Sequence, residues 1–231
     1  MEIISFLFEF FKSIFFFIPK LVKWYKERNL KKIFGSDFPN KFLIIYGEMT
    51  TCTSWQLRKP GTSGSFNVSS LVSATAMKSI MYILSFFKKV PQISSDENNK
   101  EKLDISYCSI GGLNNLKTRD ILESKENIFY NFDLGTKSNI FNKQTQKKFF
   151  IDGKYDYGFI IKIIPKSFPN RVCIAVAGLG EWGTSGSAWF LSNKWKTILK
   201  LVKNKPFGVL LKVRGGQDES AEIVDYQVSS N

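Results

Sequence analysis

The sequence predicts an α/β protein in which a mainly parallel sheet is sandwiched between helices, preceded by an N-terminal helix that associates with a membrane. The first observation behind this prediction is that short apolar runs of strand length alternate with longer amphipathic segments, as in sheets covered by helices. The second is a Phe-rich N-terminal stretch followed at once by basic residues. We therefore expect a membrane-spanning or interfacial helix with a basic flank over residues 1–34, and an α/β domain over residues 41–231.

The N-terminal stretch has the length of a membrane helix but carries charges. Residues 3–22 read IISFLFEFFKSIFFFIPKLV, close to the roughly 20 apolar residues that cross a bilayer. Glu9 and Lys12 interrupt the run and form one polar stripe at helical spacing with nearby serines. Such a helix can lie in the membrane interface with its stripe facing water. It can instead span the bilayer in a homo-oligomer, with Glu9 of one copy paired to Lys12 of the next. A helix packed on the core of a soluble protein is the remaining alternative.

A basic flank follows the apolar run. By the positive-inside rule, cations on this side place the C-terminal bulk of the chain in the cytoplasm. We therefore expect a membrane-associated protein with a cytoplasmic main domain and with lipid as a partner. The flanking residues are Lys20, Lys23, Lys26, Arg28, Lys31 and Lys32.

The domain is expected to begin with a buried strand. Residues 33–40 are rich in turn formers, and residues 42–46 (FLIIY) form a continuous apolar run, typical of a parallel strand covered on both faces. Residues 50–67 are rich in Gly, Ser and Thr and predict a loop, whereas the apolar spacing over 68–89 predicts an amphipathic helix. Residues 91–102 predict another polar loop, and residues 103–110 (LDISYCSI) a second strand.

The alternation continues in the second half. We expect a short helix over 116–125 and a short strand over 128–132. Asp152-Gly153-Lys154 is a hairpin signal between apolar runs at 149–151 and 158–164. Residues 172–177 (VCIAVA) are strongly strand-like and precede a glycine-rich loop at 178–186 and a helix at 187–203. Residues 207–213 predict a further strand and 223–228 an edge strand.

Composition restricts the chemistry and the partners. The net charge of +13 favours a polyanionic partner, although a lysine-rich composition also produces merely solvated surfaces. No histidine is present, which excludes Ser-His-Asp and Cys-His catalysis and imidazole zinc sites. Cys52, Cys108 and Cys173 lack metal-ligand spacing, so we expect reduced core cysteines and no metal. No RRM, KH or helix-turn-helix pattern is present, and nucleic acid is therefore a less favoured partner than lipid or a nucleotide.

Three predicted strands end in glycine and small polar residues. Ligands of open α/β sheets bind at the carboxyl ends of strands, so these segments are expected to form one concave anion site suited to a nucleotide, with Arg214 as a further cation. The candidate ligand-binding residues are Gly47 after the first strand; Gly111, Gly112, Asn114, Thr118 and Arg119 after the second; and Gly178, Gly180, Gly183, Thr184 and Ser185 after the strand at 172–177.

The third of these segments contains G-x-G-x-x-G between a strand and a helix. In that context glycines let the backbone approach a phosphate, and the helix N-terminus offers free N–H groups. The dinucleotide fingerprint is incomplete, because the next strand ends in Arg214-Gly215-Gly216 and not in an acid that could hold a ribose. The alternative is a tight strand–helix turn that needs small residues for packing. For the segment at Gly111 the alternative is likewise a turn, with asparagine as a helix cap.

Catalytic candidates are few. Glu48, Glu181, Asp133 and Asp156 are predicted loop carboxylates, and no motif pairs any two of them for acid–base work. Glu181 inside the glycine segment and Glu48 after the first strand are the candidates for such a role, with a solvated loop acid as the alternative.

Three motifs carry a resemblance to known proteins: YCSIGGLNNLKTR, DYGFIIKIIPKSFPN and VCIAVAGLGEWGTSGSAWFLS. They resemble segments of uncharacterised prokaryotic Rossmann-like proteins, and the match spans residues 42–228. The chain is also loosely similar to the SLOG and CARF groups of nucleotide sensors, which act in antiviral defence and are often fused to membrane helices. The resemblance implies a Rossmann-like fold and a nucleotide ligand at the matching glycines, at Asn114, Thr118 and Arg119, and at Thr184. The chain departs from those sensors in lacking an evident effector domain, so its N-terminal helix would be the effector.

These observations lead to one expected function and two alternatives. We expect a membrane-anchored cytosolic nucleotide sensor, a defence effector that acts on the membrane through its N-terminal helix when ligand binds. The first alternative is a nucleotide- or nucleoside-processing enzyme that uses Glu181 or Glu48. The second is a basic peripheral protein whose partner is anionic lipid. No cofactor beyond a nucleotide ligand is indicated.

Overall fold

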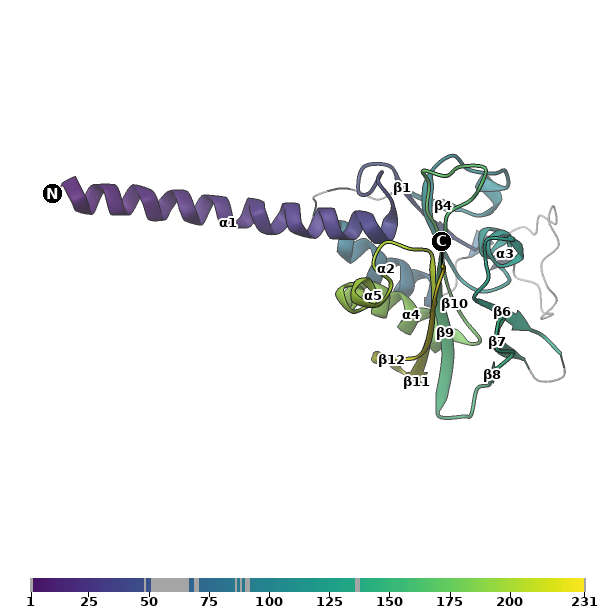
Figure 1. The fold of residues 1–231 in the computed structure, drawn as a ribbon. Coiled ribbons are helices and arrows are strands. Elements are labelled where there is room, and N and C mark those ends of the chain that lie inside the picture. The colour runs from purple at the N-terminus through teal and green to yellow at the C-terminus, as the bar shows by residue number, and fades with distance from the viewer. Residues whose placement is uncertain are drawn as a thin grey trace.

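The computed structural model has an α/β architecture built on a mixed, mostly parallel sheet of seven strands in the order β12-β11-β9-β10-β5-β1-β4 (Figure 1). It describes residues 2–47, 49–50, 67–68, 71–85, 87, 89, 92–135 and 138–230, and of residues 2–17, 49–50, 67–68 and 71–73 it describes only the backbone. The α/β class and the mostly parallel sheet agree with the prediction from the sequence.

Four neighbouring strands form the parallel half of the sheet. They are β4 (Gln92–Ser95), β1 (Phe42–Tyr46), β5 (Ser106–Ile110) and β10 (Cys173–Gly178), each parallel to the next. Helix α2 (Leu71–Ser85) lies in the connection from β1 to β4. Strand β1 comes first in the chain; the next strand, β4, is added on one side of it, and β5 and then β10 are added on the other side. The resulting order of second, first, third and fourth strand is a doubly wound order, with its switch point between β1 and β5.

The other half of the sheet is antiparallel. Strand β9 (Tyr155–Ile163) lies between β10 and β11 (Phe207–Arg214) and runs antiparallel to both, and β12 (Gln217–Val228) forms the edge. The predicted edge strand at the C-terminus is therefore confirmed. The predicted hairpin around Asp152-Gly153-Lys154 is wrong, because β9 joins the main sheet and does not pair with the strand before it.

Two smaller sheets complete the strands. One contains β6 (Tyr130–Asp133), β7 (Asn139–Asn142) and β8 (Lys148–Phe149), and the other pairs β2 (Met49–Thr50) with β3 (Asn67–Val68). Strand β4 falls inside the predicted loop at 91–102, where it precedes the short 3₁₀ helix η1 (Glu97–Asn99). Of the loop predicted over 50–67, the first and last residues belong to β2 and β3, and residues 51–66 lie outside the described residues.

Each face of the main sheet has its own apolar cluster. Helices α2, α4 (Glu181–Asn193) and α5 (Trp195–Val202) cover one face together with the end of the N-terminal helix. Helix α3 (Leu116–Glu123) and the β6–β8 sheet cover the other. The predicted helix at 187–203 is two helices in the structure, and most of the predicted glycine loop at 178–186 belongs to the first turns of α4.

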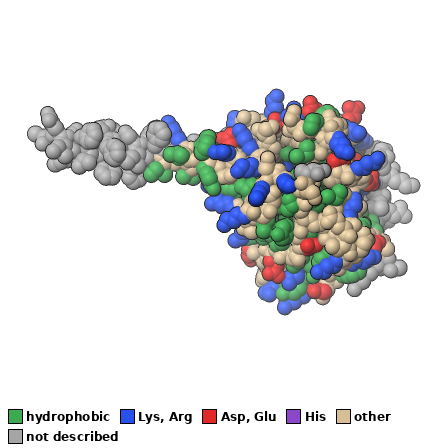
Figure 2. Space-filling view, in the orientation of Figure 1, with side chains coloured by type: hydrophobic (Ala, Val, Ile, Leu, Met, Phe, Trp, Pro, Cys, Tyr) green, Lys and Arg blue, Asp and Glu red, His purple; other side chains and the backbone are tan. Residues whose placement is uncertain are grey.

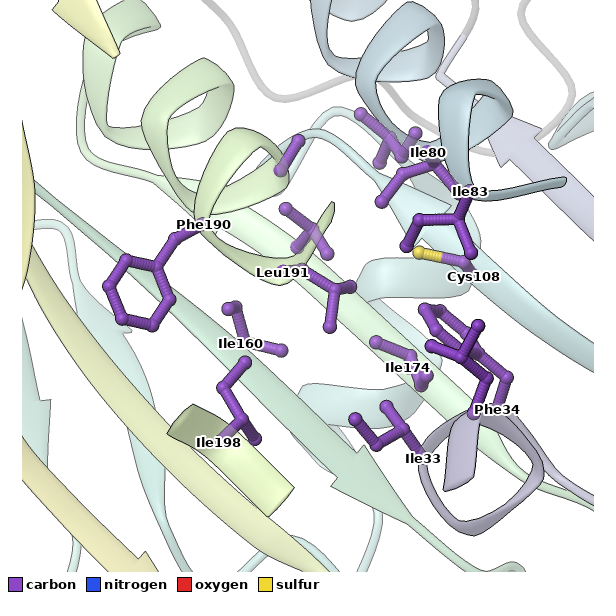
Figure 3. Close-up of a cluster of buried hydrophobic side chains, with 14 of the residues drawn as sticks. Ile33, Phe34, Ile80, Ile83, Cys108, Ile160, Ile174, Phe190, Leu191 and Ile198 are labelled. Carbon is purple, nitrogen blue, oxygen red and sulfur yellow. The ribbon is translucent and has the colours of Figure 1, made fainter. Parts of the chain in front are cut away.

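The N-terminal helix α1 (Glu2–Phe34) projects from the domain and ends inside it (Figure 1). Leu30, Ile33 and Phe34 are at most 2% exposed, and Figure 3 shows Ile33 and Phe34 in the cluster that also contains Ile174 and Leu191. The end of α1 is therefore part of the core of the domain. In the part of the chain that the structure describes, no helix has both the length and the apolar character needed to cross a membrane.

A buried lysine connects α1 to the sheet and to the end of α5. Lys162 on β9 is 1% exposed, and its Nζ donates to the carbonyl oxygens of Lys32 (2.5 Å) and Asn204 (3.3 Å). A cation at a helix C-terminus satisfies carbonyls that lack an intrahelical partner and complements the helix dipole. Burial lowers the pKa of Lys162 to about 8. The base of α1 is thus held by a polar contact as well as by apolar packing.

Candidate functional site

The glycines that follow β1 and β5 and the glycine that ends β10 meet at one edge of the sheet. Strand β5 lies between β1 and β10, so their carboxyl ends are adjacent. A Cβ atom added to Gly112 would lie 3.6 Å from the carbonyl oxygen of Gly178, and one added to Gly47 would lie 3.2 Å from Cβ of Asn115. The structure therefore brings the three predicted segments together.

Asn115, and not the predicted Asn114, occupies the switch point between β1 and β5. Its Nδ2 donates to the carbonyl oxygens of Ile45 (3.2 Å) and Ile110 (3.0 Å), which lie at the carboxyl ends of the neighbouring strands β1 and β5. Its Oδ1 accepts from the amides of Lys117 and Thr118, which makes it the N-cap of α3. Every polar atom of this buried side chain is satisfied within the protein, so Asn115 joins the strands and has no free group for a ligand.

The start of α3 is closed by a second side chain. Asp96, which follows β4 and is fully buried, accepts a hydrogen bond from the amide of Leu116 at 2.9 Å. The hydroxyl of Thr118 donates to the carbonyl oxygen of Gly111 at 2.8 Å. Of the other residues predicted here, Asn114 is exposed and Arg119 is half-buried. The amides that would cradle an anion at this helix already have protein acceptors.

The same arrangement recurs at α4. Asp156 on β9 is 5% exposed, and its carboxylate accepts from the amides of Tyr157 (2.7 Å), Gly180 (3.1 Å) and Gly183 (2.7 Å). Burial raises the pKa of Asp156, while these amides act in the opposite direction. A carboxylate of the chain thus occupies the position that the G-x-G-x-x-G pattern would give to a ligand phosphate.

The glycines of this segment allow close packing of α4 on the sheet. A Cβ atom added to Gly178 would lie 2.4 Å from the carbonyl carbon of Gly183, and one added to Gly183 would lie 2.3 Å from the carbonyl oxygen of Tyr157. Both separations are shorter than any van der Waals contact. This geometry favours the second interpretation of the segment, a tight strand–helix junction that requires small residues.

Thr184 and Ser185 are both buried in the first turns of α4. The hydroxyl of Thr184 donates to the carbonyl oxygen of Gly180 at 3.3 Å, and that of Ser185 donates to Asp218 at 2.6 Å. Their hydroxyls are therefore engaged with the helix and with β12.

An open pocket of ≈ 270 Å³ lies beside this junction. It is bounded by the start of β9, the start of α4 and the turn between β11 and β12. Two aromatic rings, one lysine and one exposed acid provide its chemistry, and three glycines leave room between them. Its lining is Ile151, Gly153, Lys154, Tyr155, Asp156, Gly180, Glu181, Trp182 and Gly215.

Cations surround the aromatic side of the pocket. Arg214 next to the hydroxyl of Tyr155 lowers the pKa of that phenol. The ammonium groups of Lys212 and Lys154 lie over the Tyr155 ring, 4.5 Å and 5.3 Å from its centre. Trp182, which also lines the pocket, is 45% exposed. A planar aromatic ligand that carries negative charge fits both features, because the rings offer stacking and the cations offer charge pairing.

Two predicted catalytic residues have different outcomes. Glu181 lines the pocket and is exposed, whereas Glu48 lies outside the described residues. Within the described ranges, no three acidic, cysteine or histidine side chains converge as metal ligands do. Sequence reasoning missed Lys154, Tyr155 and Trp182, and the only signal for them was their place beside the hairpin signal and inside the glycine segment.

The second candidate surface is the exposed part of α1. Among its described side chains, five large apolar residues are between 48% and 57% exposed: Ile18, Leu21, Val22, Trp24 and Tyr25. Lys20 and Lys23 are exposed among them and Lys26 is half-buried. Figure 2 shows this mixture of apolar and basic side chains where α1 leaves the domain. The side chains of Glu9 and Lys12 lie outside the described part of the helix.

Comparisons with known proteins do not assign the chain to a group. No protein family matches the sequence, and no curated protein matches it.

Proposed function

We propose that the protein is a membrane-attached ligand-binding domain: α1 holds it on an anionic membrane, and the pocket at the sheet edge binds a nucleotide-like anion. This retains the expected function but moves the ligand from the glycine segments to the neighbouring pocket. Membrane attachment is carried by one observation, the exposed apolar and basic surface of α1.

This surface has the composition of a membrane interface. Trp24 and Tyr25 combine an apolar body with a polar atom, which suits the headgroup level of a bilayer. Lys20 and Lys23 lie where anionic headgroups would meet them. Leu21 is 54% exposed, although the same helix buries Leu30 almost completely a few turns later. An amphipathic helix in the membrane interface accounts for the exposed apolar residues and for the lysines among them, since the apolar residues enter the lipid while the lysines stay at the headgroups.

Vesicle flotation of the full chain tests the attachment. Wild type is expected to float with phosphatidylcholine vesicles that contain phosphatidylserine, and the double variant Leu21→Ser/Trp24→Ser to remain at the bottom. The matched control is Ile93→Ser/Tyr226→Ser, which removes two apolar side chains that are 43% and 47% exposed on edge strands of the main sheet. Equal flotation of the two double variants would contradict the role of α1.

The ligand part of the proposal rests on the pocket between Tyr155 and Trp182. A nucleobase is planar and stacks on aromatic rings with a gain of about 1–3 kcal/mol. Its phosphate would face Lys154 and Arg214, and Glu181 could accept hydrogen bonds from the amino groups of a base.

Thermal unfolding of the full chain with AMP, GMP, cyclic di-AMP or inorganic phosphate tests this binding. A nucleotide at 100 times its dissociation constant is expected to add about 2.7 kcal/mol of stability. Trp182→Ala and Lys154→Gln are expected to lose that gain, and Lys125→Gln, an exposed lysine after α3, to keep it. Stabilisation by inorganic phosphate alone would contradict recognition of a base, and no stabilisation by any probe would contradict the ligand proposal.

The same samples test the enzyme alternative. Glu181 is the exposed acid in the lining of this pocket, so turnover would convert the bound nucleotide and would stop in Glu181→Gln. We expect the nucleotide to be recovered intact by chromatography after prolonged incubation, as a sensor requires.

A continuous set of elements joins the pocket to α1. Helix α4 begins at Glu181 in the pocket, and α5 follows it directly. The chain then reaches Asn204, whose carbonyl oxygen shares Lys162 with that of Lys32 in α1. Ligand binding at the start of α4 would therefore act on the base of α1 through two packed helices, which is how we propose that the protein signals.

A further inference from the structure

Helix α5 has two contrasting faces. Ile198 and Val202 are at most 1% exposed and pack in the core. Lys196 and Lys200 are exposed on the outer side of the helix, and Lys203, the residue directly after it, is exposed as well. No acidic residue occurs in the sequence between Glu181 and Asp218. The outer face of α5 is therefore basic, and no acidic residue close to it in the sequence offsets its charge.

This face lies beside the base of α1. Ile198 of α5 and Ile33 of α1 belong to the same apolar cluster, and Figure 3 shows both side chains in it. The carbonyl oxygens of Lys32, near the end of α1, and of Asn204, just after α5, both accept from the ammonium of Lys162. In Figure 2, Lys and Arg side chains gather on the domain surface next to the point where α1 enters.

We infer that the outer face of α5 is a second membrane contact, at which Lys196, Lys200 and Lys203 bind anionic lipid headgroups. The inference rests on the proposed attachment through α1. A helix alone leaves the domain free to tilt and rotate about its point of entry, whereas two contacts fix its orientation on the membrane.

The geometry of α1 places this face within reach of the lipid charge. Only about 8 Å of helix separates Tyr25, at the proposed headgroup level, from Leu30 in the core, so this part of the domain lies no farther than about that from the headgroups, whatever the tilt of α1. The attraction of an anionic leaflet extends over a Debye length, about 8 Å at physiological ionic strength. Lysines on a helix that packs beside Leu30 and Ile33 therefore lie in the range where headgroups attract them. Nucleic acid, the other polyanion that this charge could attract, is treated as an outcome of the test.

The test compares two variants with equal loss of charge. Lys196→Gln/Lys200→Gln/Lys203→Gln removes the basic face of α5. The control Lys125→Gln/Lys147→Gln/Lys148→Gln removes three exposed lysines from the side covered by α3 and the β6–β8 sheet. Binding of each full chain is measured on vesicles of phosphatidylcholine with and without phosphatidylserine, and on single-stranded RNA. Equal unfolding midpoints show that both variants are folded.

Each lysine near an anionic leaflet strengthens binding by about fivefold, so the α5 variant is expected to bind the phosphatidylserine vesicles roughly 100-fold more weakly than wild type. Binding of the control variant is expected to fall far less, and the Lys→Arg version of the α5 variant is expected to bind as wild type. Equal binding of wild type and the α5 variant to anionic vesicles would overturn the inference while leaving attachment through α1 intact. Loss of RNA binding without loss of vesicle binding would assign the face to nucleic acid and overturn it as well. Failure of wild type to bind any vesicle would overturn the proposed function and this inference together.

Discussion

The ammonium of Lys162 lies 2.5 Å from the carbonyl oxygen of Lys32, across 130 residues of sequence. Removing a lysine from water disfavours its charged form, and the pKa of Lys162 is accordingly lowered to about 8. The carbonyl groups of Lys32 and Asn204 partly offset that cost by accepting hydrogen bonds. The contact thus joins the projecting helix to the sheet at a group whose charge changes in the mildly alkaline range.

This relationship predicts a specific dependence on pH. The unfolded chain binds the proton of Lys162 with the ordinary lysine pKa of 10.5, above the folded value of about 8. Between these values the unfolded state carries more protons, so raising the pH across this window increases the free energy of unfolding. Relative to Lys162→Met, the free energy of unfolding of wild type is expected to rise by up to about 3 kcal/mol between pH 7 and pH 11. Urea unfolding of both proteins measures the difference, and a difference that does not change with pH would contradict a buried charged lysine.

The cap of α4 predicts a large loss of stability in Asp156→Ala. Three amides of Tyr157, Gly180 and Gly183 would lose their acceptor in a buried place. We expect the free energy of unfolding to fall by about 2–4 kcal/mol. The control is Asp152→Ala, since Asp152 accepts two amides in an exposed turn and its loss is expected to cost less than about 1 kcal/mol. Similar losses in both variants would show that burial of the Asp156 cap does not matter.

The positions of the strand ends could be predicted, but the groups that close them could not. Glycine after an apolar run indicates the end of a strand, and parallel order brings such ends together. Asp96 and Asp156, however, cap helices that begin about 20 and 25 residues later in the chain. Contacts of this kind depend on the final strand order and leave no local pattern, so the sequence favoured a ligand in the place that these carboxylates occupy.

Two local patterns were misleading for physical reasons. Strand β4 is short, and it lies at the edge of the sheet, so three of its four residues, Gln92–Ser95, are polar and its first three are at least partly exposed. Gly183 and Gly186 suggested a loop, yet they lie inside α4, where close packing on β9 and β11 outweighs the low helix propensity of glycine.

Neighbouring asparagines give a direct comparison of a structural and a surface residue. Asn115→Ala removes hydrogen bonds to Ile45 and Ile110 and the cap of α3, and we expect it to lower the free energy of unfolding by about 3 kcal/mol. Asn114 is exposed, so Asn114→Ala is expected to change it by less than about 0.5 kcal/mol. Chemical denaturation of the two variants checks both values, and a larger effect at Asn114 would return that residue to the candidate site.

A pair of glycine substitutions separates packing from ligand approach at the sheet edge. An added methyl group at Gly178 would lie 2.4 Å from the backbone of Gly183, whereas one at Gly112 would be in ordinary contact, 3.6 Å from the carbonyl oxygen of Gly178. Gly178→Ala must therefore displace α4 from β10, and we expect a loss of about 3 kcal/mol, at the upper end for overpacked sites. Gly112→Ala is expected to cost less than about 1 kcal/mol. If these glycines instead served to admit a phosphate, both variants would stay stable and both would lose the thermal stabilisation that nucleotides give. Unfolding with and without AMP distinguishes the two results. Substitution of a packing glycine lowers the midpoint measured without AMP, whereas substitution of a ligand glycine lowers only the midpoint measured with AMP.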